Sequence, residues 1–440
     1  MLLRRHKDII AVKGGPNHHP VAFHARNFEI AQISEEAWTA MAPTTFNNSF
    51  PMSLEESEVS SEADAFTALE SWNQEINADF KLSQLKFGIK SLTINITQIC
   101  NLHCVYCAAG GDGTYGDPIA KISVEKVLPQ IKFFLDKLNQ GDVFHVTFLG
   151  GEPLLYPQAI KLIADYVNST ALEKGLRSNF TVITNGTLIS DDNLKLLSSI
   201  KASITVSIDG PPEIHDRVRP QKNGQGSAVA VIEGLKKIIS HKKDLGRVLL
   251  HAVFSKNNLE VEKAYLFFSQ FDVDAFEFTF DVTEADEVAS HKFMSEMAKV
   301  ADLAFKSGGE SALRKIQIFD NYFRSLDRQQ GVENYCGAGK SLLSFDSNGK
   351  LYSCPLEVGK KNEYLGEAQD LNMTALQDLQ SPLIEKNNCA SCWARHLCGG
   401  GCLFNHKSLT GNKHKKHITF CERTRYLIAI ALLYYERCRN

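Results

Sequence analysis

Three cysteines, Cys100, Cys104 and Cys107, lie within eight residues in the stretch CNLHCVYC, directly after a strand-like run, SLTINI. Thiolates at this spacing, on a loop that leaves a β-strand, can face one side and bind a metal. Zinc sites take four protein ligands, or three with a water, whereas a [4Fe–4S] cluster usually takes four thiolates. Three thiolates on such a cluster leave one iron open to a small chelating molecule.

The elements around these cysteines follow a regular alternation. Six strand-like runs occur between residues 90 and 281, namely SLTINI, VFHVTFL, NFTVIT, ASITVSI, RVLLHAVF and AFEFTF. Helices are expected between them, over residues 124–138, 158–174, 191–199, 228–241 and 259–270. This alternation predicts an α/β fold with a parallel sheet, either doubly wound or an incomplete barrel.

The chemically distinctive residues follow four of the predicted strands. The cysteine loop follows the first strand, and GGEP, NGT and SIDGP follow the second, third and fourth. In both candidate folds ligands bind at the carboxyl ends of the strands. The sequence therefore predicts one site at this edge of the sheet.

The stretch CNLHCVYC, with Tyr106 before its third cysteine, resembles the CxxxCxxC signature of the radical S-adenosylmethionine (SAM) enzymes. In that family the open iron binds S-adenosyl-L-methionine, and the reduced cluster cleaves it to a 5′-deoxyadenosyl radical that takes a hydrogen atom from the substrate. The resemblance implies a partial (β/α)6 barrel over residues 88–300. It also implies a [4Fe–4S] cluster bound by Cys100, Cys104 and Cys107, which would be the catalytic residues.

Further cofactor-binding residues are implied by the same resemblance. GGEP resembles the family segment that binds the methionine amino group, and Ser207 corresponds to a contact with the ribose hydroxyls. The full set of expected cofactor contacts is Tyr106, Gly150, Gly151, Glu152, Asn185, Ser207 and Arg219. Asn185 also fits an ordinary turn. We interpret His251 as a hydrogen-bonded core histidine, and Glu277 and Asp281 as candidate substrate contacts.

The C-terminal quarter holds eight of the 11 cysteines. In a long intracellular chain this density favours metal binding over disulfides. Their spacing resembles the seven-cysteine SPASM domain, which binds two auxiliary iron–sulfur clusters; a pair of zinc sites is the alternative. The expected ligands are Cys336, Cys354, Cys389, Cys392, Cys398, Cys402 and Cys421. Cys438 has no place in the pattern.

The resemblance also implies how these ligands divide. Cys389, Cys392, Cys398 and Cys421 would bind an outer cluster, and the other three an inner one. Fully ligated relatives supply a fourth inner cysteine shortly before the first, but this chain has none between Cys107 and Cys336. The fourth ligand or the nuclearity of the inner cluster therefore stays open.

The rest of the chain completes a four-part organisation. Residues 1–87 are expected to form a small α+β unit, with one or two strands in PVAFHARNFEIAQIS, a short helix in EEAWTAM and helical spacing over residues 65–85. Residues 301–335 read as a helical linker, and residues 336–440 as the SPASM domain with a C-terminal helix. In that helix, YLIAIALLYY is too short to span a bilayer and predicts a buried segment.

The net charge and the N-terminal sequence indicate where the protein acts and what it can bind. The net charge of −3 favours neither nucleic acid nor a membrane surface as a partner, and MLLRRHKDII lacks the apolar run of a secretory signal. We therefore expect a cytoplasmic protein. An electron donor such as flavodoxin or ferredoxin would reduce its clusters.

Three functions fit these features. The first is a radical SAM oxidoreductase that matures a ribosomally made precursor peptide (RiPP), with the N-terminal unit holding the leader. An oxidative cross-link is expected, first a cyclophane of the darobactin kind and then a thioether. The second is an anaerobic sulfatase-maturing enzyme, in which an aspartate would occupy the position of Pro355. The third is a non-enzymatic metal-binding or electron-carrier protein.

Overall fold

The computed structural model describes residues 1–15, 18–46, 63–83, 88–107 and 121–439. The chain divides into two compact units. The first comprises Met1–Gln84, Ala285–Cys336 and Ser381–Asn440, and the second Leu85–Glu284 and Gly337–Gln380. These units cut across the boundaries expected at residues 87, 300 and 335, which stay predictions of functional regions.

The second unit is built on a parallel sheet with the order β12-β11-β10-β9-β8-β7-β14-β15. The six predicted strands are all present. They are β7 (Ser91–Thr97), β8 (Val143–Gly150), β9 (Arg177–Thr184), β10 (Ser203–Ser207), β11 (Val248–Phe254) and β12 (Ala275–Phe280). Each pairs in parallel with the next, which confirms the partial (β/α)6 architecture.

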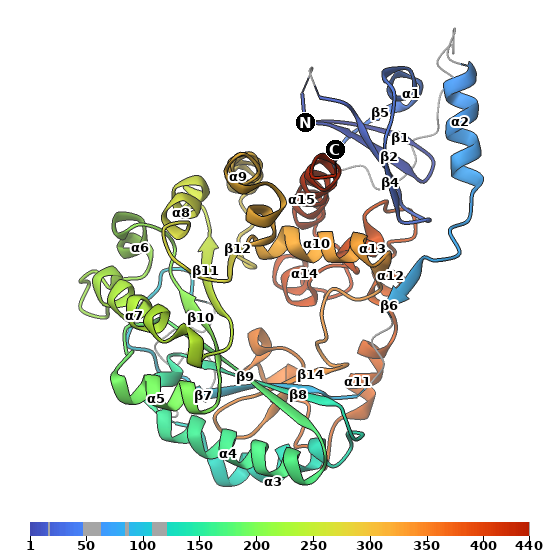
Figure 1. The fold of residues 1–440 in the computed structure, drawn as a ribbon. Coiled ribbons are helices and arrows are strands. Elements are labelled where there is room, and N and C mark those ends of the chain that lie inside the picture. The colour runs from blue at the N-terminus through green and yellow to red at the C-terminus, as the bar shows by residue number, and fades with distance from the viewer. Residues whose placement is uncertain (16–17, 47–62, 84–87, 108–120, 440) are drawn as a thin grey trace. The chain divides into compact units, whose positions relative to one another are not determined.

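Helices cover one face of this sheet (Figure 1). They are α3 (Val124–Leu135), α4 (Pro157–Glu173), α5 (Asp191–Ser199), α6 (Pro212–Val218), α7 (Ala228–Ser240) and α8 (Val261–Phe268). Strand residues alternate accordingly: Phe144, Val146 and Phe148 of β8 are buried, whereas His145 and Thr147 between them are partly or fully exposed. The face away from the helices therefore carries the polar side chains.

Two parts of the second unit were not expected. Helix α6 lies within SIDGPPEIHDRVRP, where the sequence pattern showed only a strand end. Strand β14 (Leu342–Phe345) adds to β7 in parallel and continues into the antiparallel β15 (Leu351–Tyr352). For residues 336–440 the sequence predicted a cysteine-rich domain with a C-terminal helix and no strand, but the apolar run LLSF forms a strand because it extends the sheet beside β7.

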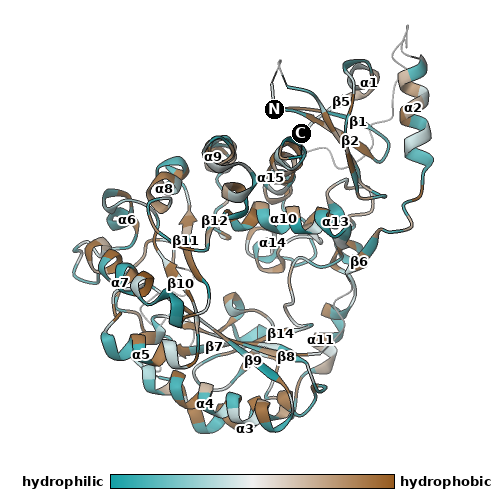
Figure 2. Ribbon diagram, in the orientation of Figure 1, coloured by the Kyte–Doolittle hydropathy of each residue, from teal (hydrophilic) through white to brown (hydrophobic). Residues whose placement is uncertain are grey.

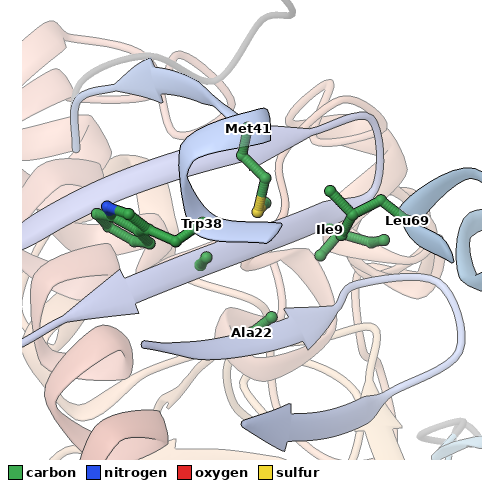
Figure 3. Close-up of a cluster of buried hydrophobic side chains, with 6 residues drawn as sticks. Ile9, Ala22, Trp38, Met41 and Leu69 are labelled. Carbon is green, nitrogen blue, oxygen red and sulfur yellow. The ribbon is translucent and has the colours of Figure 1, made fainter. Parts of the chain in front are cut away.

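The first unit contains an antiparallel sheet with the order β4-β3-β2-β1-β5. Its elements are β1 (Leu2–His6), β2 (Ile9–Lys13), β3 (Val21–His24), β4 (Glu29–Gln32), α1 (Glu35–Ala40) and β5 (Ala42–Thr44). A small apolar core under α1 joins the sheet to α2 (Ala63–Gln74) through Ile9, Ala22, Trp38, Met41 and Leu69 (Figure 3). The N-terminal unit is therefore α+β, as predicted.

The helix predicted over residues 65–85 is correct only in its first half. Helix α2 ends at Gln74, and β6 (Lys81–Ser83) instead pairs with β13 (Gln330–Val332). The side chain of Asn77 accepts a hydrogen bond from the Asp79 amide at 2.9 Å, which closes a turn between the two elements. Residues 84 and 85 lie outside the described part of the chain.

The first unit contains further helices, among them the C-terminal helix. They are α9 (Glu287–Arg314), α10 (Gln317–Asp327), α12 (Leu383–Lys386), α13 (Arg395–Cys398), α14 (Leu403–Thr410) and α15 (Ile418–Arg437). Helix α15 packs against α9, α10 and strands β2 to β4. It is buried along most of its length, as YLIAIALLYY predicted, and its hydrophobic residues are visible in Figure 2. None of the helices in the described ranges has the length and hydropathy needed to cross a membrane.

Candidate active site and cysteine centres

The cysteine loop has almost no secondary structure of its own and is held by its neighbours. The amides of His103 and Val105 donate to the carbonyls of Pro220 and Val218, at 2.8 and 3.0 Å. The loop therefore lies along the segment that follows α6. This places Cys100, Cys104 and Cys107 at the carboxyl edge of the sheet, where the sequence predicted them.

The two glycines of GGEP allow the end of β8 to touch the base of this loop. The Gly151 amide donates to the Thr97 carbonyl at 2.8 Å, and the Glu152 amide to the Ile99 carbonyl at 3.0 Å. A Cβ atom on Gly151 would lie 2.1 Å from the Ile99 carbonyl oxygen, and one on Gly150 as close to that of Thr97. No other residue fits at either position without moving the loop.

The Glu152 carboxylate binds protein groups rather than facing open space. It is fully buried and accepts from the Leu154 amide at 3.0 Å, the Thr184 hydroxyl at 2.8 Å and the Asn185 amide at 2.7 Å. Burial raises its pKa to about 7, against the effect of these donors. Glu152 therefore ties the end of β8 to the end of β9. These hydrogen bonds do not show the cofactor contact that the sequence predicted for Glu152.

Asn185 extends the same network to the first cysteine. Its Nδ2 donates to the Asn101 side-chain oxygen at 2.8 Å and lies 3.7 Å from the Cys100 sulfur. Its own oxygen accepts from the amide and hydroxyl of Thr187. The Asn-Gly-Thr turn thus supports the cysteine loop, and Asn101 is a contact that the sequence pattern did not single out.

A buried ion pair forms the opposite wall of the cysteine loop. Arg219 Nε donates to Asp209 at 2.9 Å, and the Tyr106 hydroxyl donates to the same carboxylate. Arg219 Nη1 lies 3.9 Å from the Cys104 sulfur. Burial would lower the pKa of Arg219, but Asp209 keeps it above its ordinary value, and burial raises the pKa of Tyr106. Tyr106 and Arg219, which the sequence predicted as cofactor contacts, therefore both bind the Asp209 carboxylate.

Asp209 and Arg219 are joined by a second route through His215. The Asp209 amide donates to His215 Nδ1 at 3.3 Å, and His215 Nε2 contacts the Ser227 hydroxyl at 3.0 Å. That hydroxyl donates to the Arg219 carbonyl at 2.6 Å. Because Nδ1 accepts, Nε2 carries the proton, so His215 is held neutral. Sequence reasoning missed Asp209, His215 and Ser227, although the first two lie inside the SIDGPPEIHDRVRP motif.

A row of polar residues crosses the last three strands near the same edge. Ser207, His251 and Glu277 are in register on β10, β11 and β12. His251 Nε2 lies 3.1 Å from the Thr279 hydroxyl, which agrees with a hydrogen-bonded histidine. Burial lowers the pKa of His251, and Glu277 opposes the shift.

A cavity of about 360 Å³ opens beside the third cysteine. Its lining combines Tyr106 and Cys107 with residues that follow β11 and β12, including Ser255, Lys256 and Asp281. Asp281, a predicted substrate contact, therefore faces the same cavity as Cys107.

The first unit contains a second cysteine-lined cavity, also of about 360 Å³. Its lining residues include Cys389, Cys392, Cys398 and Cys421, the four ligands expected for the outer cluster. Burial raises the pKa of Cys389, Cys398 and Cys421, and that of Cys389 to about 11. A metal that binds there must therefore displace protons. A cavity lined by four thiols fits a cluster of this kind.

The three expected inner ligands do not all belong to one unit. Cys336 and Cys402 lie in the first unit and Cys354 in the second, so the structure does not describe them as a single site. Nor does any group of three or more His, Cys, Asp or Glu side chains, within the ranges described, form a ready site for a single metal ion.

Comparison with known proteins finds a family match in the second unit. Residues 94–268 match the family model of the Radical SAM superfamily. This part of the chain is therefore similar to the proteins of that superfamily. The match begins in β7 and ends in α8, so it includes every strand end described above except that of β12.

Three curated relatives extend the similarity beyond this region. An uncharacterized protein of Methanocaldococcus jannaschii is 26% identical and covers 70% of this chain and 96% of its own length. A cysteine-type anaerobic sulfatase-maturating enzyme of Clostridium novyi is 25% identical, covering 76% of this chain and 93% of its own. The mycofactocin maturase MftC of Mycobacterium tuberculosis is 24% identical, covering 71% and 78%.

Two solved structures share the fold. The structure of anSMEcpe with bound AdoMet has a TM-score of 0.65 and 22% identity, covering 80% of this chain and 94% of its own. Streptococcus suis SuiB bound to the precursor peptide SuiA has a TM-score of 0.52 and 16% identity, covering 94% and 98%. The likeness to both structures shows a shared fold.

We predict that Gly151→Ala destabilises the second unit and weakens the cysteine loop. The added methyl group meets a backbone carbonyl, so the strand end must move, at a cost of about 3 kcal/mol in the free energy of unfolding. Urea unfolding and the iron content after anaerobic reconstitution would measure both effects. Gly88→Ala, where a Cβ meets nothing within 4 Å, is the control. Equal behaviour of the two variants would contradict the role of the close approach.

We also predict a pH dependence that originates in His215. Burial lowers its pKa from 6.5 to about 4. Between these values the unfolded chain binds the extra proton, so stability falls as the pH is lowered, by up to about 3 kcal/mol. In His215→Phe this contribution disappears, and the difference in unfolding free energy between pH 7 and pH 4.5 becomes smaller. His241→Phe, at an exposed position, should keep the wild-type slope; an unchanged slope in His215→Phe would refute the assignment.

Proposed function

We propose that this chain is a radical SAM oxidoreductase that matures a ribosomally made precursor peptide by an oxidative cross-link. The observation that carries the proposal is the convergence of the cysteine loop, GGEP, Asn185 and the Asp209–Arg219 pair at one carboxyl edge of the sheet. Relatives named as maturases support the class of reaction. SuiB, whose title describes a bound precursor peptide, supports the class of substrate.

Cys100, Cys104 and Cys107 fit the three thiolate ligands of the expected [4Fe–4S] cluster. When bound, that cluster and S-adenosyl-L-methionine supply the radical that removes a hydrogen atom from the peptide. The chain contributes the geometry. Glu152 and Asn185 fix the cysteine loop from one side, and Arg219 places a positive charge beside Cys104. Backbone groups of GGEP and the Ser207 hydroxyl are the proposed contacts to the amino group and ribose.

A cross-link removes two hydrogen atoms from the peptide and therefore two electrons. One electron leaves with the abstracted hydrogen atom. The other must pass to an acceptor while a proton leaves for a base. His251 and Glu277, in register with Ser207, are the titratable side chains of that row and are candidates for taking the proton. The four-cysteine cavity supports an auxiliary iron–sulfur cluster as the electron acceptor.

The N-terminal sheet supports the leader-binding part of the proposal. Strand β4 pairs with β3 and, within the described ranges, with no other strand, so it presents a sheet edge. An extended peptide can add to such an edge through main-chain hydrogen bonds. The predicted segment PVAFHARNFEIAQI forms β3 and β4, of which only β4 is at the edge.

Sulfatase maturation is the second candidate, because sulfatase-maturating enzymes recur among the relatives. The position expected for their aspartate base is Pro355, which begins a short 3-10 helix and offers no carboxylate. We therefore place peptide cross-linking first, with a cyclophane ahead of a thioether. A cytoplasmic location and a flavodoxin or ferredoxin as electron donor complete the proposal.

The cofactor assignment is tested by reductive cleavage of S-adenosyl-L-methionine. With dithionite, the anaerobically reconstituted wild type should release 5′-deoxyadenosine. Cys100→Ala, Cys104→Ala and Cys107→Ala should each reduce the rate by at least about a hundredfold, since the cluster loses a ligand. Cys438→Ala, outside both cysteine patterns, should cleave at the wild-type rate. Cleavage at wild-type rate in the first three variants would refute the assignment.

The reaction is tested with a precursor peptide encoded beside this gene. We expect a product lighter by two hydrogen atoms, with fragment ions missing between the two joined residues. A peptide without its leader should give much less product, because it loses the contacts at the N-terminal sheet. Tandem mass spectrometry reads both outcomes. Oxidation of a cysteine or serine to formylglycine in a sulfatase peptide, without a cross-link, would favour the second candidate instead.

A further inference from the structure

The lining of the four-cysteine cavity is strongly cationic. Besides the cysteines it includes Arg395, Lys416 and Arg425, and the described residues that line it include no Asp or Glu. Four thiolates would be buried here with little access to water. Positive side chains in such a place compensate the negative charge that the ligands carry.

Arg425 is the cation best placed to act on this centre. It is only 3% exposed, and its Nη1 lies 3.9 Å from the Cys392 sulfur. Its Nη2 is buried without a hydrogen-bond partner among the described residues. A buried guanidinium N–H without a partner is costly, so its position indicates a ligand in the cavity that accepts from it.

The N-terminal segment holds this arginine in place. The carbonyl of Phe46 accepts a hydrogen bond from Arg425 Nε, and the Phe46 ring packs against Tyr426 with centroids 4.9 Å apart. Residues nearly four hundred positions apart thus meet at one side chain. Without this carbonyl the guanidinium would lose the contact that fixes its orientation.

Strand β1 contributes a second arginine to the four-cysteine centre, next to Cys392. Arg5 donates from Nε to the Lys7 carbonyl at 2.7 Å and from Nη2 to the Ser391 carbonyl at 3.2 Å. Ser391 immediately precedes Cys392. The Nη1 of Arg5 is buried and unpartnered among the described residues, like the Nη2 of Arg425. Both arginines therefore bring positive charge to Cys392, one from the cavity wall and one from the N-terminal sheet.

We propose that Arg425 and Arg5 set the reduction potential of the outer cluster, and that the N-terminal sheet is thereby part of the electron-accepting centre. This inference rests on the proposed presence of an iron–sulfur cluster at Cys389, Cys392, Cys398 and Cys421. Accepting an electron adds one negative charge to a site that is already negative. Nearby cations stabilise the reduced form more than the oxidised form, so they raise the potential.

The experiment is a redox titration followed by electron paramagnetic resonance. It uses the full chain with Cys100, Cys104 and Cys107 replaced by Ala, which removes the first cluster's signal. The signal lost on the further change Cys389→Ala belongs to the outer cluster. At a fixed potential, Arg425→Gln should lower the ratio of reduced to oxidised cluster about tenfold, equivalent to about 59 mV for one electron. Arg5→Gln should shift it in the same direction by less.

Two variants separate charge from structure. Arg425→Lys keeps the charge and should keep the potential close to that of the wild type. Arg4→Gln removes the same charge one residue earlier on β1, where the side chain instead binds the carbonyls of Trp38, Thr39 and Met41. It should leave the potential unchanged. If Arg425→Gln fails to load iron, Arg5→Gln measured against Arg4→Gln carries the test.

The outcomes distinguish this inference from the proposed function. Equal potentials in Arg425→Gln, Arg5→Gln and Arg4→Gln, with iron retained, would overturn the inference and leave the cluster assignment intact. If both Arg425→Gln and Arg425→Lys lose iron, equal potentials in Arg5→Gln and Arg4→Gln would overturn it, and a lower potential in Arg5→Gln would support it. Iron content that does not change on Cys389→Ala would instead refute the outer cluster itself.

Discussion

The candidate active site depends on backbone hydrogen bonds that hold a loop with little structure of its own. The cysteine loop receives donors from the end of β8 at its base and donates to the segment after α6 along its length. A loop supported only by its own turns would have to become ordered when it binds a ligand, and the lost conformational entropy would cost several kcal/mol of binding free energy. Contacts on both sides supply that order in advance. The strand ends are therefore the scaffold of the loop as well as its neighbours.

This constraint explains why charged groups are buried around the loop. Glu152 and Asp209 are both fully buried carboxylates, and such groups are costly unless their oxygens are satisfied. Glu152 accepts one hydrogen bond from the Leu154 amide in its own turn and two from Thr184 and Asn185 at the end of β9. Asp209 accepts from Arg219, Tyr106 and the Val253 amide. Removing either carboxylate would leave several buried donors without partners. Each one therefore fixes the relative position of strand ends that the helices alone leave free.

The sequence was sufficient for the parallel sheet and for the place of the site. Alternating apolar runs and helical periods located all six strands, and residues 191–199 were predicted at their observed bounds. The sequence pattern did not predict those elements that form only by pairing with a distant part of the chain. Strand β14 is short and forms because β7 has an open edge, and β6 forms because β13 lies beside it.

The sequence was also insufficient for the contacts within the candidate site. Motifs identified Glu152 and Arg219 as functional, but only the folded chain shows that Asp209 and Thr184 engage them.

Both cysteine centres have an arginine beside a cysteine sulfur, but the net charge near the sulfur differs between them. In each, a buried arginine places Nη1 3.9 Å from a cysteine sulfur, Arg219 at Cys104 and Arg425 at Cys392. Arg219 is paired with Asp209, so the pair adds little net charge to its centre. Arg425 forms no ion pair with a described residue, and it is joined by Lys416 and Arg395. An unpaired cation favours a reduced, more negative cluster much more than a neutral ion pair does. If both centres hold the proposed clusters, the same contact supports a low-potential centre that gives electrons at Cys104 and a higher-potential centre that accepts them at Cys392.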